Sequence, residues 1–427
     1  MASARRVDRI SNLPRGILDL ILERLPLHDA ARTTTLSKTW RNIWVTQLHL
    51  VFDDEFVSRL ISKIDEEDQQ YKIVTTISNI LLRHRGPIFK FHLFIPGEIT
   101  LNHTSSLDSW IENIANNRIR MLEIFNNPLF VYKLPAYLFS CVELTHLHLS
   151  NCTLNAPCNF RGFPNLISVE LSGVLFTADM SFGSQLQTLD LRQCTGIKHL
   201  GCQFSYNSNL SQLIIDSEDQ FSWRWSVGNG RVIRRNAANS LKYYPIYLYK
   251  LLGNIPRIHF LCLDGYFFKF LEPDWAILIR PITTMDNLRT LHLVRVGFHD
   301  LVQVQYVLCL IRSSPNLQRL SIKLEPKVIK LRDGMESSIA NKVEQYLQLP
   351  NLADMILDKL ESVNILGIVG SRHELHFMKF LLASCTSLKW MKLSKSDAID
   401  NPKEELRIIR EVKWLHRAST RAQIIWN

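Results

Sequence analysis

The sequence predicts an α/β protein in which a small helical N-terminal unit precedes a long, repetitive body of parallel strands and helices. Apolar residues three or four positions apart fill the first fifty residues, as in short amphipathic helices. Beyond them, the pattern Leu-x-x-Leu-x-Leu recurs about eleven times, at intervals of roughly 20 to 50 residues. Turn sequences of the type Pro-Asn-Leu open several copies, which indicates that each copy starts a new strand.

Three short helices are predicted between residues 13 and 44. Pro14 fits the first turn of a helix, where a missing amide hydrogen costs nothing, and Pro26 marks the end of that helix. Asp29 and Ser37 each precede a new apolar turn, so both are predicted N-caps. A unit this short cannot bury so many apolar groups alone, which favours a docking surface. The alternative is that these residues form only the core of a helical cap on the next domain.

The order of these residues resembles the F-box, the segment by which a subunit attaches to the Skp1 adaptor of SCF-type ubiquitin ligases. The match covers Leu13-Pro14, the apolar residues that follow, and the ending Leu-Ser-Lys-x-Trp-Arg-x-x-Trp at positions 36–44. This resemblance implies a Skp1-like adaptor as partner and, through it, a cullin/RING complex. We expect some of the matching residues to pack internally. The implied Skp1 contacts are Leu13, Pro14, Leu18, Ile21, Leu22, Leu25, Pro26, Leu27, Leu36, Trp40 and Trp44.

In each repeat of the body, the second and third apolar residues are two positions apart and therefore share one face of a strand. Strands that bury one face against identical neighbours are typical of a leucine-rich solenoid, whose parallel strands line a concave surface. The clear copies are Leu144/Leu147/Leu149, Leu186/Leu189/Leu191, Leu288/Leu291/Leu293 and Leu317/Leu320/Ile322. Looser copies are Ile88/Phe91/Leu93, Ile119/Leu122/Ile124, Leu166/Val169/Leu171, Leu210/Leu213/Ile215, Ile258/Leu261/Leu263, Leu352/Met355/Leu357 and Leu388/Met391/Leu393.

Helical patterns at 301–311, 339–347 and 377–382 alternate with these strands, as a parallel solenoid requires. The segment from Glu405 to Trp426 resembles the C-terminal region of plant F-box/FBD/leucine-rich-repeat proteins. With the N-terminal match, this resemblance spans nearly the whole chain, and we interpret the C-terminal region as the end of the solenoid. The expected divisions are 1–50 for the F-box, 51–87 for a helical linker, 88–358 for the solenoid and 359–427 for the FBD-like region.

The stretch between residues 215 and 258 departs from the repeat. Residues 221–227 alternate strictly between apolar and polar types, and a Gly-Asn-Gly turn follows, which favours a β-hairpin or an additional sheet strand. Trp223, Arg224 and Trp225 are the candidate target-binding residues, because aromatic and guanidinium groups are efficient recognition elements. The alternative reading places the two tryptophans in the core of an atypical repeat.

Composition restricts the remaining classes of function. The chain has 427 residues, 46% of them hydrophobic and 21% charged, with no run of about 18 apolar residues, so no membrane span is predicted. Eight dispersed cysteines without a Cys-x-x-Cys motif favour a reducing compartment, cytoplasmic or nuclear, and buried thiols. The net charge of +10 invites an acidic partner, but dispersed Lys and Arg do not favour nucleic acid.

The sequence contains none of the motifs that intrinsic catalysis would require. No nucleophile elbow or phosphate-cradling glycine loop is present, and His373 and His376 have no third metal ligand near them in sequence. The absence of these motifs favours a non-catalytic protein, and the resemblance to F-box proteins implies a substrate-recognition subunit of an SCF-type ubiquitin ligase, with an unidentified target protein and without a cofactor. Two alternatives stay open, a Skp1-binding scaffold outside any ligase and a solenoid sensor of a small anionic ligand such as an inositol phosphate.

Overall fold

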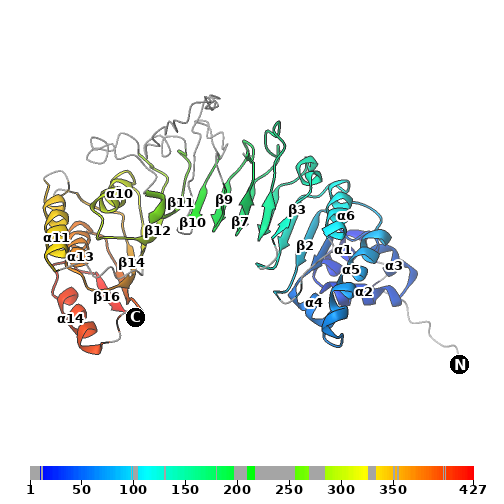
Figure 1. The fold of residues 1–427 in the computed structure, drawn as a ribbon, viewed down its shortest axis with the longest axis horizontal. Helices are drawn as coiled ribbons and strands as arrows, with labels where there is room; N and C mark the ends of the chain where they lie inside the picture. Colours follow the sequence, from blue (N-terminus) through cyan, green and yellow to red (C-terminus); the bar gives the residue numbers. More distant parts are fainter. Residues whose placement is uncertain are drawn as a thin grey trace. The chain divides into compact units, whose positions relative to one another are not determined.

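The protein forms two compact units, Met1–Leu186 with Gln193–Gly201, and Gln187–Arg192 with Cys202–Asn427. The computed structural model (Figure 1) describes residues 10, 13–97, 99, 104–128, 131–178, 180–196, 209–216, 255–268, 284–325, 333–349, 352, 355–397, 399 and 401–427. Each unit combines parallel strands with helices, which confirms the predicted α/β class.

The first unit begins with α1 (Arg15–Glu23), α2 (Leu27–Arg32), a 3-10 turn η1 (Thr33–Thr35) and α3 (Lys38–Trp44). The three predicted helices are therefore present. Ser37 caps α3 as expected, since its side chain accepts a hydrogen bond from the Trp40 amide. The Asp29 prediction is wrong, because Asp29 lies inside the first turn of α2 and Pro26 occupies the N-cap position. Pro26 thus both follows one helix and opens the next.

In the described residues of this unit, five parallel strands form the main sheet, in the order β1 (His49–Phe52), β2 (Lys90–Phe94), β3 (Met121–Phe125), β5 (His146–Ser150) and β7 (Ser168–Ser172). The helices α4 (Asp54–Ile61), α5 (Glu66–Arg83) and α6 (Thr104–Ala115) connect the first strands. Later connections use η2 (Ala136–Ser140) and a small second sheet of β4 (Tyr132–Lys133), β6 (Cys152–Leu154) and β8 (Leu175–Phe176).

The first strand, β1, lies earlier than residue 88, where the sequence placed its earliest repeat. Leu50 and Phe52 are two positions apart and fully buried, so β1 follows the same inward pattern as the other strands. β1 contains only four residues and lies between helical patterns, so its alternation of buried and exposed side chains is too short to be recognised in the sequence. The sheet therefore starts inside the segment that the sequence divided between the F-box and the linker.

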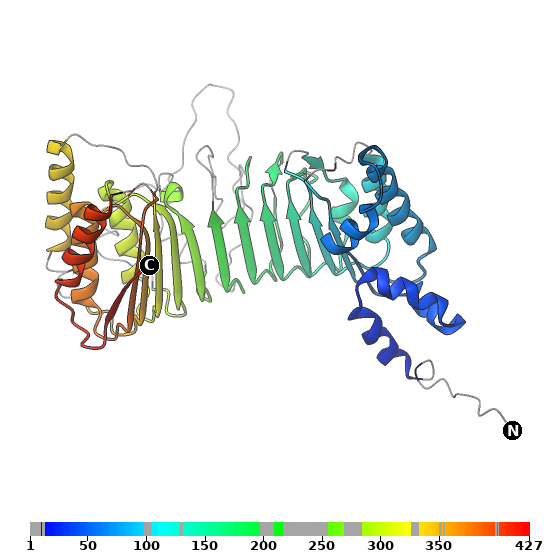
Figure 2. The same ribbon diagram turned by 90° about the horizontal axis from the view of Figure 1, so that it is seen from below.

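The described residues of the second unit include eight parallel strands: β9 (Thr188–Arg192), β10 (Gln212–Asp216), β11 (Phe260–Asp264), β12 (Thr290–Val296), β13 (Arg319–Leu324), β14 (Ser362–Ile368), β15 (Trp390–Lys395) and β16 (Gln423–Trp426). The helices of the unit that the structure describes are α8 (Gly265–Phe268), α10 (Leu301–Arg312), α11 (Asp333–Leu347), α13 (Arg372–Ser384) and α14 (Pro402–Lys413). Figure 1 shows α10, α11, α13 and α14 on one side of the strands, and Figure 2 shows the strands of each unit side by side.

The three predicted helical patterns of the second unit correspond to α10, α11 and α13, the last two of which begin earlier than expected. The expected repeat at 352–357 is wrong. Among the described residues there, 355–357 have no regular structure, and the strand is β14 with Val363 and Ile365 buried. The true copy, Leu360-x-x-Val363-x-Ile365, lacks leucine at its strand positions and was missed for that reason.

Asparagines in the turns before the strands link successive repeats. The side-chain amide of Asn165 donates to the Val142 carbonyl, and that of Asn316 donates to the Asp286 carbonyl. Asn287 makes the equivalent bond to the Pro256 carbonyl. The turn asparagines therefore satisfy backbone groups of the preceding repeat.

Candidate docking site and outward strand faces

The predicted Skp1-contacting residues divide into two groups according to their burial. Leu18, Leu22, Ala30, Trp40 and Ile43 form a buried cluster between the N-terminal helices, and Ile21 and Trp44 pack against it. Leu27 is also buried, with 5% of its surface exposed. The five cluster residues and Leu27 are therefore the core of the helical unit, and a partner cannot contact them without rearrangement. Ile21 and Trp44 are only partly buried and keep some surface open to solvent.

The other predicted residues of this set face solvent. Leu36 is 68% exposed, Leu13 and Leu25 are each 36% exposed, and Pro14 and Pro26 are exposed as well. Such a concentration of uncovered apolar side chains in one small unit is typical of an interaction surface.

Sequence reasoning left three exposed apolar residues out of the implied contacts: Ile10 (57%), Ile17 (45%) and Leu20 (58%). Ile17 and Leu20 are three positions apart and share one face of α1, whereas Leu18 and Leu22 lie on the buried face. The signal was available, because α1 carries more apolar residues than one helix face can bury. We refer to the exposed residues Ile10, Leu13, Pro14, Ile17, Leu20, Leu25, Pro26 and Leu36 as the apolar docking surface.

The strands of the first unit present a second surface. Leucines and other apolar residues alternate inward, so the intervening side chains form an outward face with rows set by the strand register. One row runs through His92, Glu123, His148 and Glu170 on four neighbouring strands. We call these four residues the His/Glu row.

Glu123 is the electrostatic centre of this row. Its Oε2 atom lies 2.6 Å from His92 Nδ1, and its Oε1 atom accepts a hydrogen bond of 2.8 Å from Lys90 Nζ. The bond with His92, together with Lys90, lowers the pKa of Glu123 to about 2. His148 Nδ1 lies 3.4 Å from Glu170 Oε2 and its ring lies 4.4 Å from that of Phe125. The row thus combines carboxylate and imidazole groups with aromatic surface that is still partly open to solvent.

The corresponding face of the second unit holds a denser ion-pair cluster. The guanidinium of Arg295 bonds to the carboxylates of Asp216 and Asp264, and it lies 5.7 Å from the centre of the Tyr266 ring. Asp264 is fully buried, and this burial raises its pKa to about 6. The charges of this cluster pair with one another, so we assign it a structural role.

The remaining sequence candidates contribute little to a site. Trp223, Arg224, Trp225 and the expected hairpin lie outside the described residues. His373 is buried, which lowers its pKa to about 4, and His376 Nε2 lies 3.4 Å from Glu344 Oε2. The described part of the chain contains no group of three residues able to hold a metal ion.

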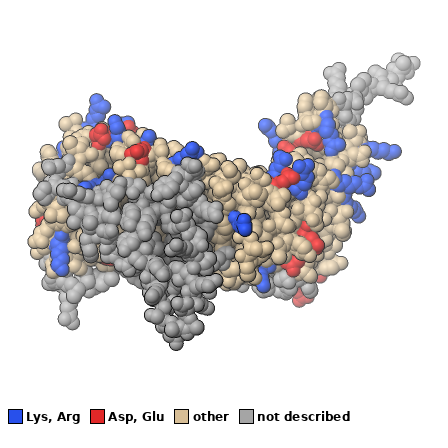
Figure 3. Space-filling view, turned by 90° about the horizontal axis from the view of Figure 1, so that it is seen from above, with Lys and Arg blue, Asp and Glu red and all other residues tan. Residues whose placement is uncertain are grey.

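Further sequence expectations concern membranes, charge and thiols. None of the helices in the described ranges is long and apolar enough to cross a membrane. Figure 3 shows Lys and Arg scattered among uncharged side chains on the face in view, without a single basic tract among the coloured residues. Cys262 and Cys309, which lie within apolar strand and helix patterns, are buried as expected, whereas Cys158 is exposed.

Comparisons with known proteins match both the N-terminal helices and part of the repeated strands. The F-box domain model matches residues 10–50, and a model described as FBD-associated F-box protein At5g56370, LRR repeats, matches residues 107–223. The chain is 30% identical over 427 residues to the F-box/FBD/LRR-repeat protein At1g13570 of Arabidopsis thaliana, covering 98% of each chain. It is 22% identical to the F-box/FBD/LRR-repeat protein At1g78750 of the same plant, covering 99% of this chain and 97% of the relative.

Proposed function

The chain belongs to the plant F-box/FBD/LRR-repeat family, and we propose that it is the substrate-recognition subunit of an SCF-type ubiquitin ligase. An F-box implies binding to Skp1, and the proteins of this family are non-catalytic adaptors. The proposed mechanism is geometric. One surface of the chain docks on the adaptor, another holds the target, and ubiquitin transfer is completed by an enzyme elsewhere in the complex. Such an arrangement raises the effective concentration of the target without any covalent chemistry in this chain.

The apolar docking surface is the observation that carries this proposal. The helical unit already has a complete core around Trp40, yet it leaves Leu20 and Leu36 more than half exposed. Burial of apolar surface is the main source of affinity in stable interfaces, and its coefficient is about 25 cal/mol per Å². We therefore propose that the exposed members of this surface contact Skp1 directly, whereas the buried members hold the helices in position.

For the target, we propose the outward strand face of the first unit. The His/Glu row offers imidazole and carboxylate groups for hydrogen bonds, and Phe125 adds an aromatic surface between His92 and His148. Partly exposed polar and aromatic side chains on a rigid sheet can recognise a folded or extended polypeptide with little loss of entropy. The sheet hydrogen bonds keep these side chains at a constant spacing.

The test compares docking variants with matched controls in the full chain. Leu20→Asp/Leu36→Asp places two charges on the apolar docking surface, and Tyr71→Asp/Leu82→Asp places two on α5 at positions that are 72% and 80% exposed. We expect the first pair to abolish co-purification with a Skp1-type adaptor, because a buried unpaired carboxylate opposes binding strongly. The control pair is expected to bind normally. Retained binding by the Leu20/Leu36 variant would refute this docking surface.

Reconstituted ubiquitin transfer separates a ligase subunit from a scaffold. Affinity capture with the wild type and the Leu20→Asp/Leu36→Asp variant should retain the same target proteins and differ only in the adaptor. These substitutions are preferable to deletion of residues 1–50, because β1 begins at His49 and a deletion would damage the sheet. A captured target that is never ubiquitinated in the complete complex would favour the scaffold alternative.

A further inference from the structure

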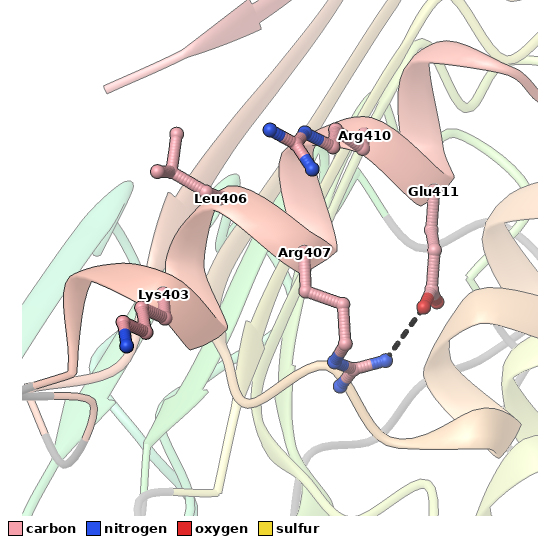
Figure 4. Close-up of a pocket in the computed structure, with 5 residues that line it drawn as sticks. All are labelled: Lys403, Leu406, Arg407, Arg410 and Glu411. Atoms are coloured by element: carbon pink, nitrogen blue, oxygen red, sulfur yellow. Dashed lines mark hydrogen bonds and ion pairs between the residues drawn. The ribbon is translucent and has the colours of Figure 1, made fainter.

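The exposed side of α14 combines apolar and cationic side chains in a stripe. Lys403, Leu406, Arg407, Arg410 and Glu411 follow the helical spacing of three and four residues and line an open hollow of about 400 Å³. In Figure 4, Leu406 and Arg410 project from one side of the helix, whereas Arg407 turns toward Glu411. Trp414, the residue that follows the helix, is 88% exposed, and Leu406 is 52% exposed.

The carboxylates of α14 are all engaged within the protein. Arg407 holds both Glu404 and Glu411, with N–O distances of 2.5 and 2.7 Å. Glu405 accepts hydrogen bonds from Lys395 Nζ and from Trp426 Nε1, at 2.8 and 2.9 Å. The bond from Arg407 also lowers the pKa of Glu404 below its ordinary value.

The cations of the same helix are in excess. In the described parts of the chain, Lys403, Arg410 and Lys413 take part in no ion pair, and all three are exposed. Residues 401–427 contain six Lys or Arg against three Glu, a net charge of +3. The stripe therefore presents uncompensated positive charge beside two uncovered apolar side chains.

The opposite side of α14 is seated closely on the second unit. Ile408 and Val412 are buried, and Arg407 Nη2 donates to the Gly370 carbonyl at 3.2 Å. Gly370 has a φ of +76°, and a side chain there would overlap Ile408, so its lack of a Cβ allows this close approach. A helix held in this way presents its outer side chains at constant positions, which lowers the entropy cost of binding.

We propose that this face of α14 binds an acidic polypeptide segment that also carries apolar side chains. The three unpaired cations match carboxylates, and Leu406 and Trp414, about two helical turns apart, match apolar residues between them. Exposed Trp and Arg are the residue types that most often dominate binding energy. The phosphate backbone of a nucleic acid would satisfy the cations but would leave Leu406 uncovered. This binding face shares no residue with the apolar docking surface, and the proposal does not depend on the proposed ligase function.

The probe is a fluorescein-labelled synthetic peptide in which pairs of Glu alternate with Leu and Phe, titrated with the full chain and followed by anisotropy. We expect saturable binding that weakens about tenfold in Arg410→Glu/Lys413→Glu, because two attractive contacts become repulsive. Leu406→Ser/Trp414→Ser should weaken binding by about the same factor. Lys379→Glu/Lys392→Glu changes the net charge equally at exposed positions on α13 and β15, and it should bind like the wild type.

Three results would overturn the proposal. The first is no saturable binding of the peptide by the wild-type chain, and the second is an equal loss in the control variant. The third is tighter binding of a single-stranded oligonucleotide or of anionic vesicles, with no dependence on Leu406 or Trp414. Because every substituted side chain is exposed, all variants should retain the wild-type circular dichroism spectrum and unfolding temperature, which verifies that the fold is intact.

Discussion

Two substitutions in the helical unit separate residues that maintain its core from residues that face the partner. Trp40 is 4% exposed within the cluster of N-terminal helices, whereas Leu36 is 68% exposed. Replacing a buried tryptophan by alanine typically costs about 3–5 kcal/mol of stability. Trp40→Ala should therefore unfold the helical unit and lose Skp1 binding indirectly.

Leu36→Ala should behave in the opposite way. Complete burial of a leucine side chain is worth about 2 kcal/mol, so covering the 68% that is exposed contributes about 1.4 kcal/mol to binding. That energy corresponds to about a tenfold change in Kd. Stability should change by less than about 0.5 kcal/mol, because Leu36 makes little contact in the free protein.

The assay measures the two quantities on the same samples. Thermal unfolding followed by circular dichroism reports stability, and titration of a Skp1-type adaptor by biolayer interferometry reports Kd. The reasoning fails if Trp40→Ala retains wild-type stability and yet loses binding, because Trp40 would then be a direct contact. It also fails if Leu36→Ala binds the adaptor as tightly as the wild type.

Two further predictions concern the strand face and the C-terminal helix. In the wild type, the lowered pKa of Glu123 stabilises the fold above its ordinary pKa of 4.5, and this contribution disappears as the pH falls toward about 2. Glu123→Gln, which lacks the charge, should remove about 1–2 kcal/mol at neutral pH, after allowance for solvent screening, and flatten the acid unfolding profile between these values. Gly370→Ala should destabilise the packing of α14 by about 1–3 kcal/mol, seen as faster hydrogen exchange in α14. Gly16→Ala, in open space on α1, should be neutral or stabilising by up to about 1 kcal/mol, and equal effects of the two glycine substitutions would contradict this account.

Most strands could be predicted because each inward side chain lies two positions from the next. Leu147 and Leu149 of β5 and Leu291 and Leu293 of β12 are buried as this spacing requires. Two strands were missed. β1 is only four residues long, and β14 has Val363 and Ile365 where the repeat pattern expects leucine. A short strand or a substituted repeat is recognised by its neighbours in the sheet, which are distant in the sequence.

The apolar content of the N-terminal unit was also evident from the sequence, but the assignment of individual residues was not. Ile17 and Leu20 have the same chemistry as Leu18 and Leu22, and all four belong to one helix. Only the packing of α3, with Trp40, against α1 decides which pair becomes core and which faces solvent.

The amino-acid sequence by itself determined the helical beginning, the repeating strands and the family to which the chain belongs, because these depend on local periodicity and ordered motifs. The tertiary structure decided which apolar side chains stay uncovered and which charges stay unpaired. On α14, for example, Glu405 accepts hydrogen bonds from Lys395 and Trp426, two residues outside the helix. Glu405 is therefore not available to pair with the cations of α14 itself. Local patterns describe neighbours within one element, whereas exposure and charge pairing are set by contacts between elements that are remote in sequence.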